Sequence, residues 1–411
     1  MTSQEIDRGP VSSTKAQVMR QHHLTRLLFL IVASLLLAAC ASAPRDSSLA
    51  ADPPAPDSAG DALRAYFAEV DRSGWPRAPA SLAWPTGQAL TRIAVASCRT
   101  QEEPAPILDA VLTREPDLFL YIGDNVYGDV WSLSPDMETL IEAYAELSQQ
   151  PDFQRLAASV PIMATWDDHD YGMNDAGGSY YGKYGSEAIF ETYWGMEDHP
   201  VASRDGVYYS QVFGPIGQRV QIIMLDTRFF RTELTRTPRR NEPGMERYVP
   251  SAAPDQDMLG PDQWAWLEAV LQEPAELRLL VSSVQILADG HGWEAWKQLP
   301  LAQSRLYQTV AASGAKGVVL VSGDRHLSAL YRQDGLTDYP LYEITASSLN
   351  RSFRDESDEM SSNQLGRAYS KENFGEIGID WKARSVSLSV HGETGETVRE
   401  QVVSFAEIGV R

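Results

Sequence analysis

The sequence predicts an α/β fold in which two mixed β-sheets pack together within one domain and are flanked by helices. Three observations predict it. From Thr91 to Ser322, short apolar runs rich in β-branched residues alternate with segments of helical length, which is the pattern of βαβ units. Beyond His326 the predicted elements are mostly strands, and these must pair with one another or with the earlier strands, which extends the sheets. Four strands end in polar turns, which indicates one shared set of loops.

The individual elements follow from periodicity and from turn residues. The first strand, helix and strand form a compact βαβ unit, which is expected to be parallel and right-handed. Residues 171–200 are dense in Gly and Tyr, so they are predicted as an irregular excursion. Residues 352–372 are polar and poor in β-branched residues, which predicts a mobile flap. The predicted strands are 91–97, 117–122, 160–165, 208–213, 219–227, 277–284, 317–322, 328–333, 340–347, 374–381, 385–391 and 396–405, and the helices are 104–114, 135–148, 152–159, 261–272 and 299–313.

The N-terminus is predicted to be a targeting segment. Basic residues up to Arg26 precede the apolar run 27–39, which is too short to span a bilayer comfortably. The run ends in Leu37-Ala38-Ala39-Cys40 and resembles a bacterial lipobox. The resemblance implies that residues 1–39 are a lipoprotein signal peptide and that Cys40 is acylated. Since Ala41 and Ser42 are not aspartate, it also implies a lipid anchor in the outer membrane of the cell envelope. An uncleaved anchor and a plain signal peptide are the alternatives.

Residues 40–90 are then the lipidated tether and connector, and residues 91–411 are the folded domain. The tether at 41–60 is rich in Ala, Pro, Ser and Asp, a composition that favours a solvated linker. A short amphipathic helix is predicted at 61–70, and a connector rich in Trp and Pro follows at 75–87.

The charge balance restricts the partners. The net charge is −21, and a field of that sign repels nucleic acid and anionic membrane, so neither is a general partner. The lipid anchor is the only membrane contact that we expect. A phosphate-bearing substrate needs local cations, and a group of arginines between Arg228 and Arg240 is one source. These arginines form either a solvated loop or a clamp that binds a phosphate bidentately.

Cysteine content points to a metal or to an inert thiol. The chain has two cysteines. If Cys40 is lipidated, Cys98 has no partner for a disulfide in an oxidising compartment. A lone cysteine is either buried and inert or held by something else, and the position of Cys98 at a strand end favours a metal.

Eight candidate ligands follow the strand ends. Thiol, phenol, carboxyl, carboxamide and imidazole groups together are a metal-binding set, and several are too costly to bury unpaired. Cysteine and tyrosinate on one ion suit iron(III), whereas the oxygen-rich subset suits calcium or manganese. We therefore expect two or more unlike metals with a bridging carboxylate. The candidates are Cys98, Asp124, Tyr127, Asp168, His169, Asn174, Asp324 and His326.

These blocks resemble a known family. Ser97-Cys98, Gly123-Asp124-Asn125-Val126-Tyr127, Trp166-Asp167-Asp168-His169-Asp170 with Asn174, Asp226-Thr227-Arg228 and Gly323-Asp324-Arg325-His326 occur in order. As a set they are similar to the motifs of the PhoD-like alkaline phosphatase and phosphodiesterase family, which is related to purple acid phosphatases and metallophosphoesterases. The resemblance covers about residues 91–345. It implies an αββα sandwich, metallophosphoesterase-like, that hydrolyses phosphate esters.

The resemblance also implies a set of roles. Cys98, Asp124, Tyr127 and His326 would hold iron(III), and Asp124, Asn174 and Asp324, with Asp168, would hold calcium; manganese and zinc are other possible metals. A metal-bound hydroxide would attack phosphorus in a small phosphate-ester substrate. His169 would protonate the leaving oxygen or bind phosphate, with a supporting hydrogen bond to a ligand as its alternative role. Arg228 is the candidate phosphate clamp, and Asp226 is expected to pair with it.

Two features depart from the family. Some members have an aspartate two residues after the cysteine, where this chain has Thr100, so one calcium ligand is uncertain. Some also begin with a β-sandwich domain, for which the residues between Cys40 and Thr91 are too few. His291 follows another strand and is interpreted as a capped loop histidine rather than a ligand.

Two other functions remain open at this point. One is a non-catalytic surface lipoprotein that binds carbohydrate or peptide through its tryptophans and its Gly/Tyr segment. The other is a phospholipase-type esterase with two identical divalent metals. The choice between monoester and diester, the leaving group and the oligomeric state are not determined by the sequence.

Overall fold

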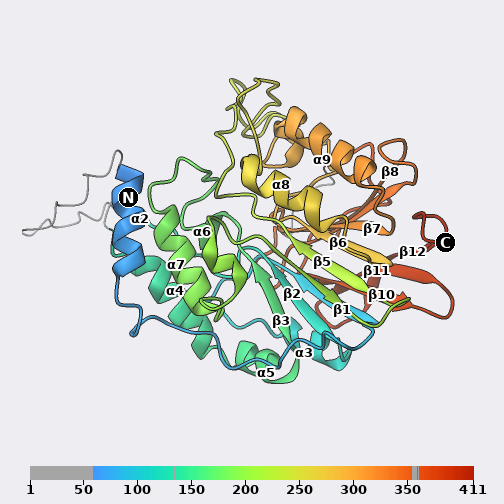
Figure 1. The fold of residues 1–411 in the computed structure, drawn as a ribbon, viewed down its shortest axis with the longest axis horizontal. Coiled ribbons are helices and arrows are strands. Elements are labelled where there is room, and N and C mark those ends of the chain that lie inside the picture. The colour runs from blue at the N-terminus through green and yellow to red at the C-terminus, as the bar shows by residue number, and fades with distance from the viewer. Residues whose placement is uncertain (1–58, 133–134, 354–358, 360) are drawn as a thin grey trace, which may run out of the picture. The chain divides into compact units, whose positions relative to one another are not determined.

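The fold was analysed in a computed structural model (Figure 1), which describes residues 59–132, 135–353, 359 and 361–411. The predicted signal peptide 1–39 and Cys40 lie outside the described residues. Within the described ranges, no helix is both long and apolar enough to cross a membrane.

The first sheet has six strands in the order β12-β11-β10-β1-β2-β3. β1, β2 and β3 are parallel, and Ile93 of β1 lies opposite Leu118 of β2. β10 pairs antiparallel to β1 and is followed outward by β11 and β12. The parallel βαβ start is thereby confirmed. The bounds are β1 (Arg92–Ala96), β2 (Leu118–Ile122), β3 (Ile162–Thr165), β10 (Asn373–Asp380), β11 (Ser385–Gly392) and β12 (Thr397–Ser404).

The second sheet also has six strands, in the order β4-β5-β6-β7-β9-β8. β5, β6, β7 and β9 are parallel, while the edge strands β4 and β8 are antiparallel to their neighbours. The predicted hairpin is β4 with β5. The bounds are β4 (Tyr209–Phe213), β5 (Val220–Met224), β6 (Leu277–Val281), β7 (Val318–Ser322), β8 (Ser328–Gln333) and β9 (Leu341–Ala346).

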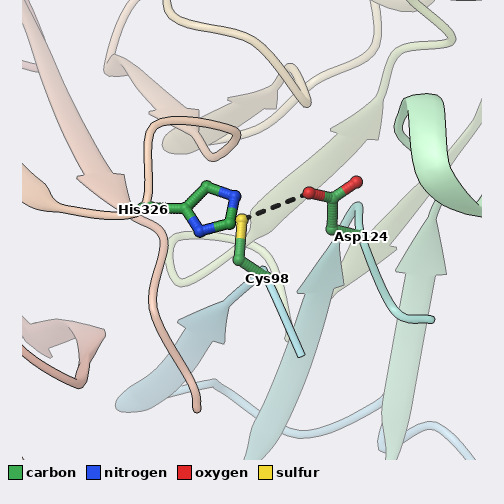
Figure 2. Close-up of side chains that lie close together, drawn as sticks. All are labelled: Cys98, Asp124 and His326. Carbon is green, nitrogen blue, oxygen red and sulfur yellow. Dashed lines mark hydrogen bonds between the residues drawn. The ribbon is translucent and has the colours of Figure 1, made fainter. Parts of the chain in front are cut away.

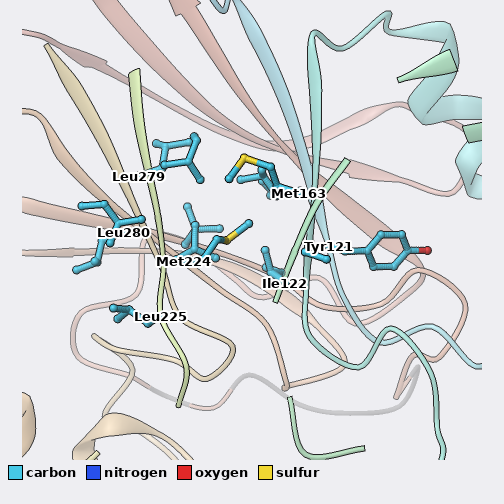
Figure 3. Close-up of a cluster of buried hydrophobic side chains, with 14 of the residues drawn as sticks. Tyr121, Ile122, Met163, Met224, Leu225, Leu279 and Leu280 are labelled. Atoms are coloured by element: carbon cyan, nitrogen blue, oxygen red, sulfur yellow. The ribbon is translucent and has the colours of Figure 1, made fainter. Parts of the chain in front are cut away.

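The core lies where the two sheets meet. Figure 3 shows side chains of β2 and β3 next to side chains of β5 and β6, among them Ile122, Met163, Met224 and Leu279. Every residue of β2, β5, β6 and β7 is buried. Strands that are covered on both faces carry continuous apolar runs, which is why these strands could be recognised in the sequence.

Helices cover the outer faces. In Figure 1, α3, α4, α5 and α7 lie beside the first sheet, and α8 and α9 run along the second. This arrangement confirms the prediction of two mixed sheets flanked by helices. The bounds are α2 (Ala59–Glu69), α3 (Ile107–Thr113), α4 (Glu138–Gln149), α5 (Pro151–Ser159), α6 (Asp168–Tyr171), α7 (Lys183–Tyr193), α8 (Gly260–Val270) and α9 (Pro300–Ser313), with 3₁₀ turns η1 (Pro200–Ser203) and η2 (Trp296–Gln298).

Two segments differ from the sequence prediction. The irregular excursion predicted at 171–200 contains the helix α7, whose buried face includes Ile189, Phe190 and Tyr193; its Gly and Tyr content concealed the helical period. The described part of 352–372, expected as a flap, pairs with β8: Ser328 N donates to Tyr369 O at 2.8 Å and Leu365 N donates to Leu330 O at 2.7 Å.

Candidate metal centre

The predicted ligands converge at the carboxyl ends of four parallel strands. Cys98 follows β1, Asp124 follows β2, Asp168 begins α6 after β3, and Asp324 follows β7. Figure 2 shows Cys98, Asp124 and His326 meeting although their segments are far apart in the chain. Crevices of this kind are where open α/β sheets bind ligands.

Four donor groups form the first cluster. Cys98 Sγ lies 3.4 Å from Asp124 Oδ2. The hydroxyl of Tyr127 donates to the same Asp124 oxygen at 3.0 Å and lies 3.2 Å from His326 Nε2. One ligand atom each from Cys98, Asp124 and His326 can be chosen so that all lie within 4.8 Å of one another. Sulfur, phenol, carboxylate and imidazole therefore surround one point.

An oxygen-rich cluster adjoins the first. Ligand atoms of Asp167, Asp168 and Asp324 lie within 4.8 Å of one another, as do those of Asp124, Asp168 and His169. Asn174 lines the same cavity, and its backbone N–H donates to Asp129 Oδ1 at 2.7 Å. Asp124 thus belongs to both clusters, which is the position of a bridging carboxylate.

The backbone that carries these ligands is strained. Cys98, Asp124, Asp324 and His326 have φ values of 56°, 48°, 69° and 53°, a left-handed region that non-glycine residues rarely adopt. Such residues cluster at active sites because the surrounding structure holds them there. The strain therefore supports a functional role for these four positions.

Two glycines make the convergence possible. A Cβ on Gly123, whose φ is +108°, would lie 2.5 Å from Asp167 Cβ. A Cβ on Gly323 would lie 2.5 Å from Ser97 Oγ. Only glycine allows the turns after β2 and β7 to approach so closely.

The centre brings several acidic groups together where they are shielded from solvent. Burial, with the nearby Cys98 and Asp168, raises the pKa of Asp124 well above its usual value. Burial and the neighbouring Asp167 likewise raise the pKa of Asp324. Burial raises the pKa of the Cys98 thiol to about 11, against hydrogen bonds from Ser347 and Ser97 that lower it. These groups resist ionisation unless positive charge is supplied.

Buried carboxylate oxygens of the predicted ligands lack a partner among the described residues. They are Asp124 Oδ1 and Asp168 Oδ1. Burial and the nearby Arg325 and Arg351 lower the pKa of His326 to about 3, so its imidazole is neutral and able to ligate. Unsatisfied buried acceptors beside a thiol and a phenol fit metal ions. The residues present therefore fit bound metal cations.

His169 is oriented by a residue that the sequence analysis did not single out. Its Nδ1 lies 2.6 Å from Asp129 Oδ2, and its ring centroid lies 4.2 Å from that of Tyr127. Burial opposes its charge, but Asp168 and Asp124 raise the pKa of His169 to about 10. The signal was present, because Asp129 ends the same acidic turn that holds Asp124 and Tyr127.

Arg228 lies beneath the cavity rather than in its wall. Its guanidinium is fully buried; Nε donates to Asp167 Oδ1 at 2.6 Å and Nη1 donates to Glu294 Oε2 at 2.6 Å. Arg228, which the sequence suggested as a phosphate clamp, therefore already binds two carboxylates of the protein. Asp226 does not pair with the Arg228 side chain, but accepts the Arg228 backbone N–H at 2.8 Å and the Trp166 indole N–H at 2.9 Å.

The cavity itself has a volume of about 240 Å³. Besides the predicted ligands, it is lined by seven residues to which the sequence analysis gave no role: Asp175 and Arg325 adjoin predicted ligands in the chain, whereas the other five lie far from them and gave no local signal. The seven residues are Asp175, Arg247, Trp293, Glu294, Arg325, Arg351 and Phe353.

Two further positions are accounted for without metal chemistry. His291 is buried away from the cavity lining, and its Nε2 lies 2.9 Å from Gln285 Oε1, as its interpretation as a loop histidine expected. Thr100 donates its backbone N–H to Asn350 Oδ1 at 2.8 Å and does not line the cavity.

The fold and the site together describe an α/β protein of two mixed sheets with a buried candidate metal centre at the ends of its strands. The chain belongs to the PhoD-like phosphatase family, whose match spans residues 93–386. No curated protein matches it. A solved structure titled "Structure of PhoD" shares 15% identity, with 78% of this chain and 70% of that chain covered and a TM-score of 0.61, which supports a common fold.

Other solved structures are more distant. The 5′-nucleotidase precursor from Thermus thermophilus shares 13% identity, with 76% of this chain and 53% of that chain covered and a TM-score of 0.33. A Vps29 mutant from Entamoeba histolytica shares 11% identity, with 76% of this chain and 98% of that chain covered and a TM-score of 0.28. These TM-scores are too low to add to the argument.

Proposed function

We propose that the protein is a phosphoric ester hydrolase of the phosphodiesterase or alkaline phosphatase type that uses iron(III) and calcium. The observation that carries the proposal is the meeting of Cys98 Sγ, Tyr127 Oη and His326 Nε2 around Asp124. Family membership makes the chain an enzyme and so argues against the non-catalytic lipoprotein.

The proposed ligand assignment follows the two clusters. Cys98, Asp124, Tyr127 and His326 would hold iron(III), because thiolate and phenolate suit that ion. Asp124, Asn174 and Asp324, with Asp168, would hold calcium, which prefers oxygen ligands. When bound, these cations would supply positive charge to the phosphoryl oxygens and activate water.

The side chains around the clusters position a substrate. Asp129 engages Nδ1 of His169, which leaves Nε2 as the nitrogen for a substrate oxygen. His169 lines the cavity, so we assign it the proton for the leaving oxygen or a hydrogen bond to the phosphoryl group. Arg228 keeps Asp167 and Glu294 in place from below, and we propose no direct substrate contact for it.

The proposal is tested with purified protein loaded with iron and calcium. We expect hydrolysis of bis-p-nitrophenyl phosphate or p-nitrophenyl phosphate, near-stoichiometric iron by elemental analysis, and a violet tyrosinate absorption. Tyr127→Phe should lose the absorption, whereas Tyr121→Phe should keep it, because Tyr121 is buried on β2 away from the cavity lining. No turnover of either ester with both metals bound would end the proposal. Activity in a colourless protein with two identical divalent metals would favour the phospholipase-type alternative.

We also propose that the protein is attached to the cell envelope through Cys40, on the sequence pattern Leu37-Ala38-Ala39-Cys40. Metabolic labelling with radioactive palmitate should mark the wild-type chain and not Cys40→Ser. Equal labelling of both chains would refute the anchor.

A further inference from the structure

Three arginines line the cavity, and two of them are committed to carboxylates. Arg247 forms an ion pair with Asp175. Arg325 donates from Nε to Glu359 Oε1 at 2.9 Å. Arg351, the third, forms no ion pair with any acidic residue that the structure describes. A guanidinium at the cavity is therefore available to an incoming anion.

The main chain that carries Arg351 is held on both sides. Asn350 Nδ2 donates to Thr100 O and to Glu103 O, each at 3.0 Å. Phe353 N donates to His326 O at 3.3 Å. The Arg351 side chain is exposed, and its guanidinium carbon rests 4.1 Å from the ring centroid of Tyr127. A fixed main chain with an exposed, charged side-chain end suits a residue that binds an incoming anion.

We propose that Arg351 is the anion-binding residue of this cavity and makes it prefer phosphate monoesters, which are dianions, over diesters. The inference rests on the proposed function and names its substrate class. A monoester has three non-bridging oxygens, whereas a diester has two. When two oxygens are bound elsewhere in the site, only the monoester keeps a charged oxygen for Arg351. The planar guanidinium binds such oxygens with two N–H groups.

The other charged side chains of the cavity already have a role. Asp124, Asp168 and Asp324 line the same space and are proposed metal ligands, so their negative charge is balanced by the bound cations and does not occupy Arg351. The alternative is that Arg351 only covers the ring of Tyr127, which would be a structural contact.

Arg305 provides a matched control. Its guanidinium carbon lies 4.4 Å from the ring centroid of Trp264, and it is an exposed arginine on α9 that does not line the cavity. Arg305→Met removes one charge and one arginine–aromatic contact, as Arg351→Met does, and in addition one exposed ion pair to Glu268, which contributes little. A difference between these variants therefore reports the position of the charge.

The experiment uses the full, metal-loaded chain and compares wild type, Arg351→Met, Arg351→Lys and Arg305→Met. Inorganic phosphate binding is measured by calorimetry, and KM and kcat are measured for p-nitrophenyl phosphate and bis-p-nitrophenyl phosphate. We expect Arg351→Met to weaken phosphate binding and to raise KM for the monoester by about tenfold or more, the usual effect of losing a hydrogen bond to a charged group. The diester KM should change much less, Arg351→Lys should be intermediate, and Arg305→Met should resemble wild type.

Three results would overturn the inference. One is unchanged phosphate affinity and monoester KM in Arg351→Met. Another is an equal rise in KM for both esters. The third is a loss of kcat with unchanged KM and an altered tyrosinate absorption, which would show that Arg351 acts through Tyr127. If wild type hydrolyses neither ester, the proposed function fails, while phosphate binding still tests Arg351.

Discussion

Arg228 links two buried carboxylates, Asp167 and Glu294, below the cavity. Burial raises the pKa of Asp167 to about 6, against the lowering effect of Arg228, and burial raises the pKa of Glu294 to about 7 against Arg228 and Arg231. Without the guanidinium, two carboxyl groups would remain buried with less positive charge nearby to balance their negative charge. At the scale of single residues, Arg228 is therefore a structural cation.

Replacing Arg228 should consequently affect stability. Arg228→Met is expected to lower the free energy of unfolding by about 3–5 kcal/mol, the usual cost of leaving a buried charge without its partner. Urea denaturation monitored by fluorescence would measure this change.

Arg219→Met is the control, because Arg219 pairs with Glu276 in a partly exposed position. Removing that pair should lower the free energy of unfolding by less than about 1 kcal/mol.

If Arg228→Met has the same free energy of unfolding as wild type but binds phosphate more weakly, Arg228 binds the substrate phosphate directly.

At the scale of elements, Phe67 is the side chain of α2 that is most deeply buried among those that the structure describes, with Leu63 partly buried beside the core. Phe67 is 3% exposed and packs against α7, where a Cβ on Gly185 would lie 2.6 Å from the Phe67 ring. Arg64 adds an ion pair to Asp205 at 2.5 Å, but Arg64 is half exposed, so this pair contributes little. The helix therefore docks mainly through Phe67.

Phe67→Ala should detach α2 while leaving the sheets intact. We expect cleavage by a protease between α2 and β1 to become at least about tenfold faster, since deleting a buried aromatic side chain removes several kcal/mol of packing. Limited proteolysis followed by mass spectrometry would locate the cut. Tyr66→Ala should leave the rate unchanged, because Tyr66 is 44% exposed; equal rates for the two variants would contradict the docking role of Phe67.

At the scale of the whole molecule, the acidic centre joins both sheets. Asp124 follows β2 of the first sheet and Asp324 follows β7 of the second, and both carboxyl groups face the same cavity. A cation bound between them would act on the packing of the two sheets as well as on the chemistry.

Calcium should therefore raise the thermal unfolding midpoint of the metal-free protein. Binding at a hundredfold excess over Kd stabilises a fold by about 2.7 kcal/mol, which amounts to a few degrees for a domain of this size. Differential scanning fluorimetry with and without calcium would measure it.

Asp324→Asn removes one carboxyl group of the centre and should abolish most of the calcium effect without lowering the midpoint of the metal-free protein. Asp334→Asn is the control, since that carboxylate is 70% exposed. A calcium shift of full size in Asp324→Asn would show that calcium binds elsewhere.

The sequence by itself determined the strands, the two mixed sheets and the ligand-bearing turns, because apolar runs and glycine turns are local features of the chain. It also placed eight candidate ligands at strand ends, and the family resemblance grouped Cys98, Asp124, Tyr127 and His326 among them; the structure brings these four together. The tertiary structure alone decided which arginine faces the cavity. Arg228 and Arg351 carry the same charge. Arg228 is buried and pairs with Asp167 and Glu294 from distant segments, whereas Arg351 is exposed and lines the cavity.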